Sequence, residues 1–185
     1  MILLIFMISS CRSTRTPTQP PQPSLPEGEV EIIVPCSGPE FFTDAEVLRA
    51  NSIGESIDLS VSKRKAMTDA RAQLAASIQT TVKAVTDNYV RSSENNNDEN
   101  LGERFESLNR EVMSQELKGI RKICERYFRT PEGKYKTYVA IELSAQELVS
   151  AYHSRLKNIK GIDYDYEKLK ETFEAQMLKQ NQIDN

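Results

Sequence analysis

An amphipathic stretch between residues 58 and 90 constrains the fold of this chain more than any other feature of its sequence. Apolar residues recur there at spacings of three and four, which places them on one stripe of an α-helix. The stripe consists of Met67, Ala70, Leu74, Ile78, Val82, Val85 and Tyr89. Asp58 precedes the stripe and can cap the N-terminus of the helix. The helix is narrowed by four alanines, which let it lie close against a sheet: Ala66, Ala72, Ala75 and Ala76.

Two β-type runs precede this helix. Residues 30–34 (VEIIV) predict a short strand that Pro35 stops, and residues 47–53 (VLRANSI) predict a second strand that Gly54 ends. Between them, residues 36–39 have the composition of a turn.

After the long helix, the polar segment 91–100 has no periodicity and predicts a surface loop or a frayed helix end. Residues 101–116 predict a second helix. Residues 119–129 and 134–143 then predict the two strands of a hairpin, joined by a turn at 130–133. The second strand alternates, with one face made of Tyr135, Thr137, Val139, Ile141 and Leu143, and the other of Lys136, Tyr138, Ala140 and Glu142.

Two further helices are predicted at the C-terminal end. Residues 144–147 (SAQE) form a capping box before a helix whose inner face carries Leu148, Tyr152 and Leu156. Residues 163–182 predict the last helix, with an apolar stripe made of Tyr166, Leu169, Phe173 and Met177. This stripe either folds back on the domain or serves as a partner surface for a second copy or another protein.

The order of these elements predicts the fold class. Strands, a long helix, a second helix, a hairpin and two helices indicate an α+β fold with a small antiparallel sheet. One face of this sheet is covered by the long helix, and the C-terminal helices are added to it. The chain then divides into an export signal (1–10), a tether that begins at Cys11 (11–29), the α+β domain (30–160) and the C-terminal helix (161–185).

The N-terminus carries an unbroken apolar run, residues 1–8 (MILLIFMI), followed by Ser9, Ser10 and Cys11. The run is far shorter than the roughly 20 residues that span a bilayer, and it matches the apolar part of a secretory signal. Residues 8–11 resemble the bacterial lipobox, which implies cleavage before Cys11 and lipidation of its thiol. No Lys or Arg precedes the run, so we expect the natural start to lie upstream. The alternative is a buried N-terminal strand with an incidental cysteine.

The segment 12–28 contains five prolines and predicts a polyproline or disordered tether. At about 3.1 Å per residue it could hold the domain roughly 50 Å from the bilayer. In lipoprotein sorting, an aspartate after the lipidated cysteine favours retention in the inner membrane. Arg12 stands there instead, so the resemblance implies the outer membrane, with the domain facing the periplasm or the cell surface.

Once Cys11 carries a lipid, Cys36 and Cys124 are the two cysteines that remain. An even number of cysteines in an oxidising compartment favours a disulfide between them. Two separate buried thiols are the alternative.

Other candidate chemistry is sparse. His153 is the only histidine and has no His-x-x-x-His partner, and Asp163 and Asp165 stand where acids favour a helix start. We therefore expect no catalytic residue, no metal and no cofactor. A net charge of −3 and a pI of about 5.4 argue against nucleic acid as a partner. A basic patch on the hairpin could meet lipid headgroups or an acidic partner, or form a solvated strand edge; it comprises Arg121, Lys122, Arg126 and Arg129.

Residues 49–56 (RANSIGES) and 65–75 (KAMTDARAQLA) together resemble the twenty-kilodalton bacterial lipoprotein family. Its members place a glycine-containing strand before a helix of the form A-x-x-x-A-R-x-x-L-A. The matching residues here are Ala66, Ala70, Arg71, Leu74 and Ala75. The likeness extends over about residues 45–150, with the strand 135–143 in the place of the family's closing strand.

The resemblance implies a helix packed on an antiparallel sheet, related in fold to the N-terminal domain of flagellar assembly protein T. It implies an outer-membrane lipoprotein without enzymatic activity, and it supplies no catalytic residue to carry over. Two classes of function stay open. The first is a non-enzymatic envelope lipoprotein whose domain binds another envelope protein or self-associates. The second is an envelope hydrolase or a carbohydrate-binding module, for which the sequence offers no convergent polar cluster.

Overall fold

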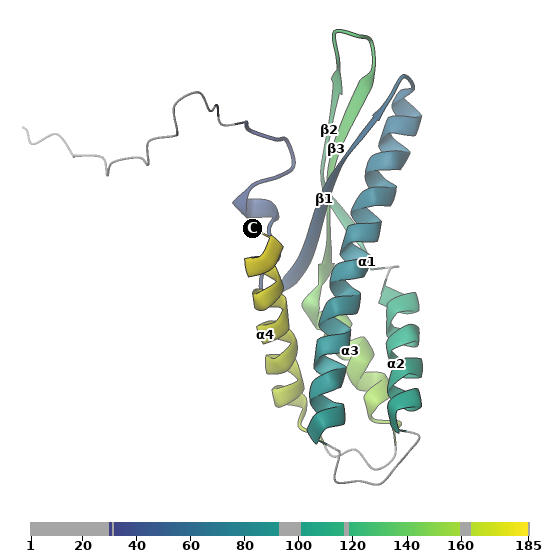
Figure 1. Cartoon of the computed structure of the whole chain (residues 1–185), viewed down its shortest axis with the longest axis vertical. Coiled ribbons are helices and arrows are strands. Elements are labelled where there is room, and N and C mark those ends of the chain that lie inside the picture. The colour runs from purple at the N-terminus through teal and green to yellow at the C-terminus, as the bar shows by residue number, and fades with distance from the viewer. Residues whose placement is uncertain (1–29, 31, 93–100, 117–118, 160–163, 185) are drawn as a thin grey trace, which may run out of the picture. The chain divides into compact units, whose positions relative to one another are not determined.

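The computed structural model describes residues 30, 32–92, 101–116, 119–159 and 164–184. The chain divides into two compact units, Met1–Ile32 and Ile33–Asn185, and the helices and strands of the described residues belong to the second. The predicted signal, Cys11 and the proline-rich tether lie outside the described residues. The elements, shown in Figure 1, are a 3-10 helix η1 (Pro39–Phe41), β1 (Val47–Ser56), α1 (Leu59–Ser92), α2 (Leu101–Glu116), β2 (Arg121–Arg129), β3 (Tyr135–Ser144), α3 (Ala145–Leu156) and α4 (Tyr166–Asp184).

The three strands form one antiparallel sheet in the order β1-β3-β2, so β3 is central. Leu48 pairs with Leu143 on β3, and Arg126 of β2 pairs with Tyr138. The alternation predicted for β3 is confirmed. Its buried face, which packs on α1, carries Thr137, Val139, Ile141 and Leu143, and we call the opposite side the outer face. The α+β class, with a small antiparallel sheet covered on one face by a long helix, is confirmed.

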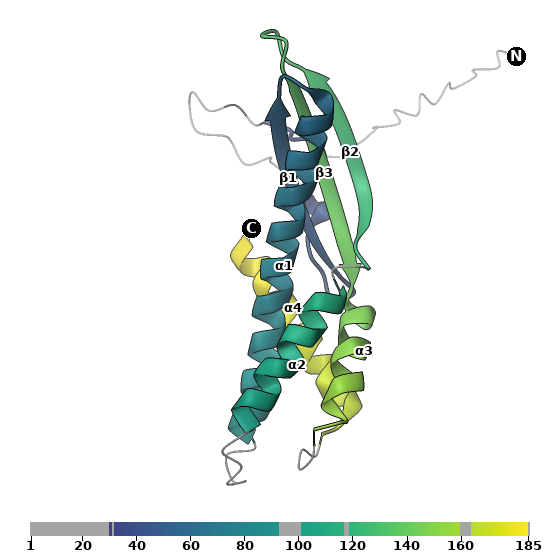
Figure 2. The same ribbon diagram turned by 90° about the vertical axis from the view of Figure 1, so that its right-hand side faces the viewer.

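Helix α1 runs the length of the unit, with the sheet beside one half of it and α2, α3 and α4 beside the other (Figures 1 and 2). The apolar stripe explains this arrangement because Ala70, Leu74 and Ile78 are all fully buried. The helix start is confirmed as well, since Asp58 Oδ1 accepts the N–H of Val61 at 3.0 Å. The helix covers β1 and β3, while β2 lies to its side and is almost wholly exposed (Figure 2).

Gly54 does not end the first strand, as the sequence predicted, because β1 continues to Ser56. A Cβ atom at Gly54 would lie 2.2 Å from the carbonyl oxygen of Ser62 and 2.5 Å from the backbone nitrogen of Ala66. The glycine therefore allows the backbones of β1 and α1 to touch inside the strand.

Two local predictions need correction, and a third is tested only at its start. Residues 30 and 32–34 form no strand, because no neighbouring strand pairs with them, and Val30, Ile32 and Ile33 are at least 80% exposed. Segment 91–100 was predicted as a surface loop or a frayed helix end; Arg91 and Ser92 belong to the end of α1, and residues 93–100 lie outside the described part. Ser144 precedes α3 without a side-chain capping bond.

The start of α3 is held by a tertiary hydrogen bond, since Ser144 makes no side-chain capping bond. Ala145 N–H donates to the carbonyl of Glu46, just before β1, at 2.8 Å. The helix is thus anchored by tertiary structure, and the rest of its prediction is confirmed, since Leu148, Tyr152 and Leu156 are fully buried.

Helix α4 folds back on the domain. Leu169, Phe173 and Met177 are fully buried, and the ring of Phe173 meets the ring of Tyr152 edge to face with centroids 5.3 Å apart. The hypothesis that this stripe is a partner surface is therefore wrong. The stripe completes the core that α1 and α3 leave open, and its remaining member, Tyr166, is half-buried.

Candidate functional site

A disulfide joins Cys36 to Cys124, with their Cα atoms 5.6 Å apart, which confirms the predicted pairing. Cys124 pairs across the ladder with Ala140, which belongs to the outer face of β3. Because paired residues point to the same side of a sheet, the disulfide also lies on the outer face. Beside it, β2 has an irregularity in register between Lys122 and Cys124. The chain that leads into β1 is thereby fixed to the face that α1 does not cover.

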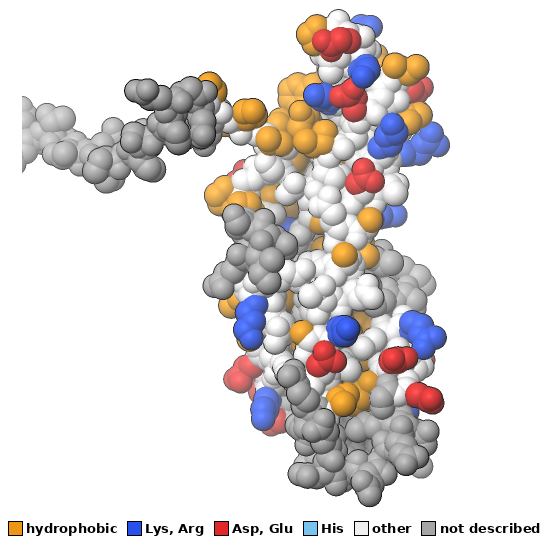
Figure 3. Space-filling model, in the orientation of Figure 1, with side chains coloured by type: hydrophobic (Ala, Val, Ile, Leu, Met, Phe, Trp, Pro, Cys, Tyr) orange, Lys and Arg blue, Asp and Glu red, His pale blue; other side chains and the backbone are white. Residues whose placement is uncertain are grey.

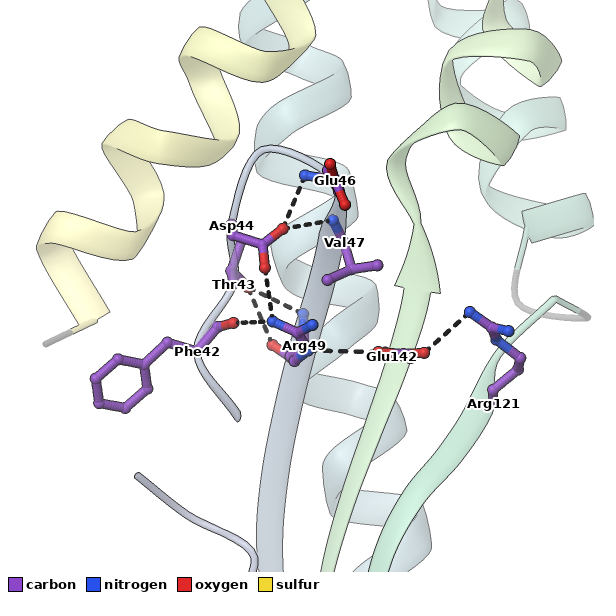
Figure 4. A network of polar contacts seen from close by, with 8 residues as sticks. All are labelled: Phe42, Thr43, Asp44, Glu46, Val47, Arg49, Arg121 and Glu142. Carbon is purple, nitrogen blue, oxygen red and sulfur yellow. Dashed lines mark hydrogen bonds and ion pairs between the residues drawn. The ribbon is translucent and has the colours of Figure 1, made fainter. Parts of the chain in front are cut away.

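A polar network surrounds Arg49, whose side chain leaves β1 on the same outer face (Figure 4). Its Nη1 donates to the carbonyl of Phe42 at 2.6 Å and to Asp44 Oδ2 at 2.9 Å. Its Nε reaches Glu142 Oε2 at 3.4 Å, and the second oxygen of Glu142 accepts Arg121 Nη2 at 2.9 Å. This row of alternating charges ties the lead-in segment, residues 33–46, to all three strands.

The lead-in segment also caps the open edge of β1. Thr43 Oγ1 accepts the backbone N–H of Arg49 at 2.9 Å and donates to the carbonyl of the same residue at 3.3 Å. Asp44 Oδ1 accepts the N–H groups of Glu46 and Val47 at 2.8 and 3.0 Å. Two side chains thus satisfy backbone groups that a fourth strand would otherwise bind.

The charge state of Asp44 follows from these contacts. Partial burial alone would raise the pKa of its carboxyl group. The hydrogen bonds from Glu46, Val47 and Arg49 outweigh burial, and the pKa lies below its ordinary value of 3.8. A depressed pKa means that the network adds stability at neutral pH and loses it as the pH falls through the lowered pKa.

Asp44→Asn should therefore lower the urea midpoint at pH 7, with a cost of roughly 1 kcal/mol, because the amide loses the charge that Arg49 binds. The difference from the wild type should shrink as the pH falls through the lowered pKa of Asp44, because the wild-type carboxyl group then becomes protonated. Urea titrations between neutral and acid pH measure this. Asp69→Asn is the matched control, because Asp69 is exposed on α1 and forms no ion pair within the described residues. A constant gap between Asp44→Asn and the wild type at every pH would contradict the assignment.

A cleft of about 490 Å³ lies beside Arg49, between the lead-in segment, β1, α1 and the end of α4. It is lined by Phe41, Phe42, Thr43, Arg49, Ala50, Asn51, Gln73, Ala76, Ser77, Thr80 and Gln180. None of these lining residues is Asp, Glu, His or Cys. The cleft offers hydroxyl and amide groups for hydrogen bonding, while its one cation, Arg49, is already bound to two carboxylates.

His153 packs between two tyrosines and holds helices together. Its Nδ1 lies 2.9 Å from the hydroxyl of Tyr164, and its ring meets the rings of Tyr164 and Tyr166 edge to face. These contacts join α3 to the segment before α4. Asp165 Oδ1 accepts the N–H of Lys168 at 2.9 Å, as expected of an acid at a helix start, and Asp163 lies outside the described residues.

A buried polar chain connects three helices at the far end of the unit. Thr86 Oγ1 lies 2.9 Å from the hydroxyl of Tyr152 on α3 and 2.8 Å from Asn109 Oδ1 on α2. Burial raises the pKa of the Tyr152 hydroxyl, which therefore stays protonated at neutral pH. This chain satisfies polar groups within the core, and sequence analysis did not identify it.

The predicted basic patch is present and exposed on β2. Arg121 pairs with Glu142 and Lys122 pairs with Glu125. The guanidinium of Arg129 lies 5.8 Å from the centre of the Tyr135 ring. Arg126, the fourth member, is exposed as well.

Within the ranges that the structure describes, no three His, Cys, Asp or Glu side chains are grouped as metal ligands would be. The same ranges contain no helix with the length and apolar character needed to cross a membrane. No protein-family model, curated protein or solved structure matches this chain.

Proposed function

We propose that this protein is a non-enzymatic envelope lipoprotein, anchored to the outer membrane by a lipid on Cys11, whose domain has a structural or protein-binding role. The observation that carries the proposal is the pairing of the other two cysteines. Cys36 and Cys124 bond to each other, so Cys11 is the cysteine left over. Cys11 is also the cysteine that follows the apolar run and the lipobox-like residues.

The disulfide supports export on separate grounds. Disulfides persist in oxidising compartments such as the periplasm and are rare in the reducing cytosol. The bond between Cys36 and Cys124 is therefore what a protein exported by the N-terminal signal would be expected to carry.

The resemblance to the twenty-kilodalton lipoprotein family is a second support, and it concerns packing. Three of the residues that carry it, Ala66, Ala70 and Leu74, are fully buried, and Gly54 lies where α1 and β1 touch. Positions of this kind specify how a helix lies on a sheet. They agree with a scaffold role and contribute no reactive group.

The alternative of a glycoside hydrolase would need two carboxylates facing one cavity. The cleft beside Arg49 presents hydroxyl and amide groups in their place. Two carboxylates, Asp87 and Glu106, do line the cleft of about 670 Å³ between α1 and α2, together with Lys83 and Arg110. We retain the lipoprotein as the proposed function because the cysteine pattern supports it directly.

Metabolic labelling with an alkyne-bearing fatty acid tests this proposal. The wild-type chain, expressed with its natural start in a bacterial host, should take up the label, and Cys11→Ser should abolish it. The matched control is the double variant Cys36→Ser/Cys124→Ser, which removes the other two cysteines and should remain labelled. Separation of inner and outer membranes should place the labelled protein in the outer fraction. Label retained by Cys11→Ser would refute the lipid anchor.

A further inference from the structure

The sheet has a free end, which we call the sheet tip and define as residues 53–65 and 126–136. The turn from β1 into α1 and the turn from β2 into β3 lie at this same end, since Ser56 and Arg129 both pair with Tyr135. The tip is the upper end of the unit in Figure 1, and α2, α3 and α4 lie beside the opposite half of α1. It is therefore free of contact with the helices that complete the core.

Large apolar side chains are exposed around the sheet tip, on both faces of the sheet and at the turn between β1 and α1. Ile57 is 81% exposed, and four more are between 36% and 49% exposed: Ile53, Leu59, Tyr127 and Phe128. Single exposed apolar residues are common on protein surfaces and need no explanation. A group of five around one end of a domain, from β1, the turn after it, α1 and β2, indicates a contact with something else.

The same end is rich in cations. The two ranges that define the tip contain seven Lys or Arg and three Asp or Glu, whereas the whole chain has 24 and 27. The three acids are already engaged. Glu55 pairs with Lys134 and Lys136, Asp58 caps α1, and Glu132 accepts a hydrogen bond from its own backbone.

Several of the tip cations have no carboxylate partner. Among the described residues, Arg64, Arg126 and Arg129 form no ion pair. Lys63 lies 4.8 Å from the centre of the Tyr127 ring. The surplus charge of the tip is therefore available to an anionic partner.

The shape of the tip favours a deformable partner. Three clefts in the described part of the chain all lie away from the tip. The first is the cleft beside Arg49, the second lies between α2 and α3, and the third lies between α1 and α2. Figure 3 shows orange, blue and red side chains close together over the narrow sheet end. Protruding apolar side chains among cations insert readily into a membrane interface, where headgroups supply negative charge.

We infer that the sheet tip is a second membrane contact, which binds the surface of a bilayer containing anionic phospholipid. The inference rests on the proposed lipid anchor, which would place the domain beside such a surface. The anchor alone would leave the domain free to move at the end of a long tether. Contact through the tip would hold the domain upright against the membrane, with α2, α3 and α4 directed away from it.

Vesicle flotation tests this inference without the lipid. The mature chain from residue 11 onward, carrying Cys11→Ser, is mixed with vesicles of phosphatidylcholine alone or of equal parts phosphatidylcholine and phosphatidylglycerol. The protein should float with the anionic vesicles and only weakly with the neutral ones. Arg126→Glu/Arg129→Glu should weaken binding by about fivefold or more for each cation removed. Ile57→Ser/Phe128→Ser should weaken it through loss of apolar insertion.

The matched control reverses two exposed charges at the other end of the unit, Lys83→Glu/Arg110→Glu, and should bind as the parent does. Circular dichroism checks that every variant is folded. The inference is overturned if the parent fails to float with anionic vesicles, or if the tip and control variants lose binding equally. It is also overturned if Ile57→Ser/Phe128→Ser abolishes a dimer seen without vesicles, because the patch would then join two copies. Since Cys11 is already replaced, a failure of the lipid-anchor proposal would show only in the labelling experiment.

Discussion

Gly54→Ala should lower the free energy of unfolding by about 3 kcal/mol or more, a large share of the roughly 5–15 kcal/mol typical of a domain. The added methyl group would lie 2.2 Å from the carbonyl oxygen of Ser62 and 2.5 Å from the nitrogen of Ala66. Both are backbone atoms, so no side chain can rotate to make room. Either α1 or β1 has to move.

Movement at this point would also break a buried polar junction. Ser62 Oγ donates to the carbonyl of Gly54 at 2.9 Å and lies 2.7 Å from Thr137 Oγ1 on β3. Ser62 and Thr137 are both fully buried, so hydrogen bonds lost here are not replaced by water. The steric and polar costs therefore add.

Urea denaturation followed by circular dichroism measures the cost. Gly133→Ala is the control, because Gly133 has a positive φ of 81° but only the end of the Arg129 side chain within 4 Å. It should cost about 1–2 kcal/mol from backbone strain alone. Equal midpoints for the two variants would show that α1 and β1 do not touch through their backbones.

Gly54 also shows where prediction from sequence stops. A glycine after a β-type run ordinarily marks a strand end, and only the position of α1 reveals that it serves close packing instead. By contrast, the stripe of α1 and the alternation of β3 were predictable. Each depends on the spacing of residues within one element, which the sequence displays directly.

Two other predictions also depended on tertiary partners that the sequence does not display. Residues 30–34 have the composition of a strand, but strand formation needs a neighbouring strand to pair with, and the described sheet ends at β1 and β2. The stripe that contains Phe173 required burial, and its sequence could not say whether this chain or a partner would supply the surface. The core left open between α1 and α3 decided this.

The candidate site was less predictable than the fold. Arg49 is a single charged residue in a strand, and its partners lie up to 93 positions away in sequence, at Glu142. The nearest local signal was Thr43 and Asp44, residue types that often bond to nearby backbone groups. The disulfide was predictable as a pairing because only two cysteines were left, but its place on the outer face of the sheet was not.

Removal of this disulfide, by Cys36→Ser/Cys124→Ser, should lower the free energy of unfolding by about 4 kcal/mol. The two cysteines are 88 positions apart, so the bond closes a long loop and restricts the unfolded chain strongly. In the folded state, β2 and the segment before β1 should become less ordered. Strand β2 is an exposed edge that α1 does not cover, and the disulfide is its covalent link to the segment before β1.

Three measurements test this prediction. The urea midpoint of the double variant should fall, and the wild type in a reducing agent should fall to the same value. Hydrogen exchange should speed up in β2 and in residues 33–46, while Leu74 on α1 and Phe173 on α4 stay protected by the core. Thiol titration of denatured, unreduced chain carrying Cys11→Ser should find no free thiol, and two thiols would exclude the bond. If the double variant matched the wild type in stability, the Arg49 network and the ladder between β2 and β3 would be sufficient to hold the lead-in segment and the edge strand.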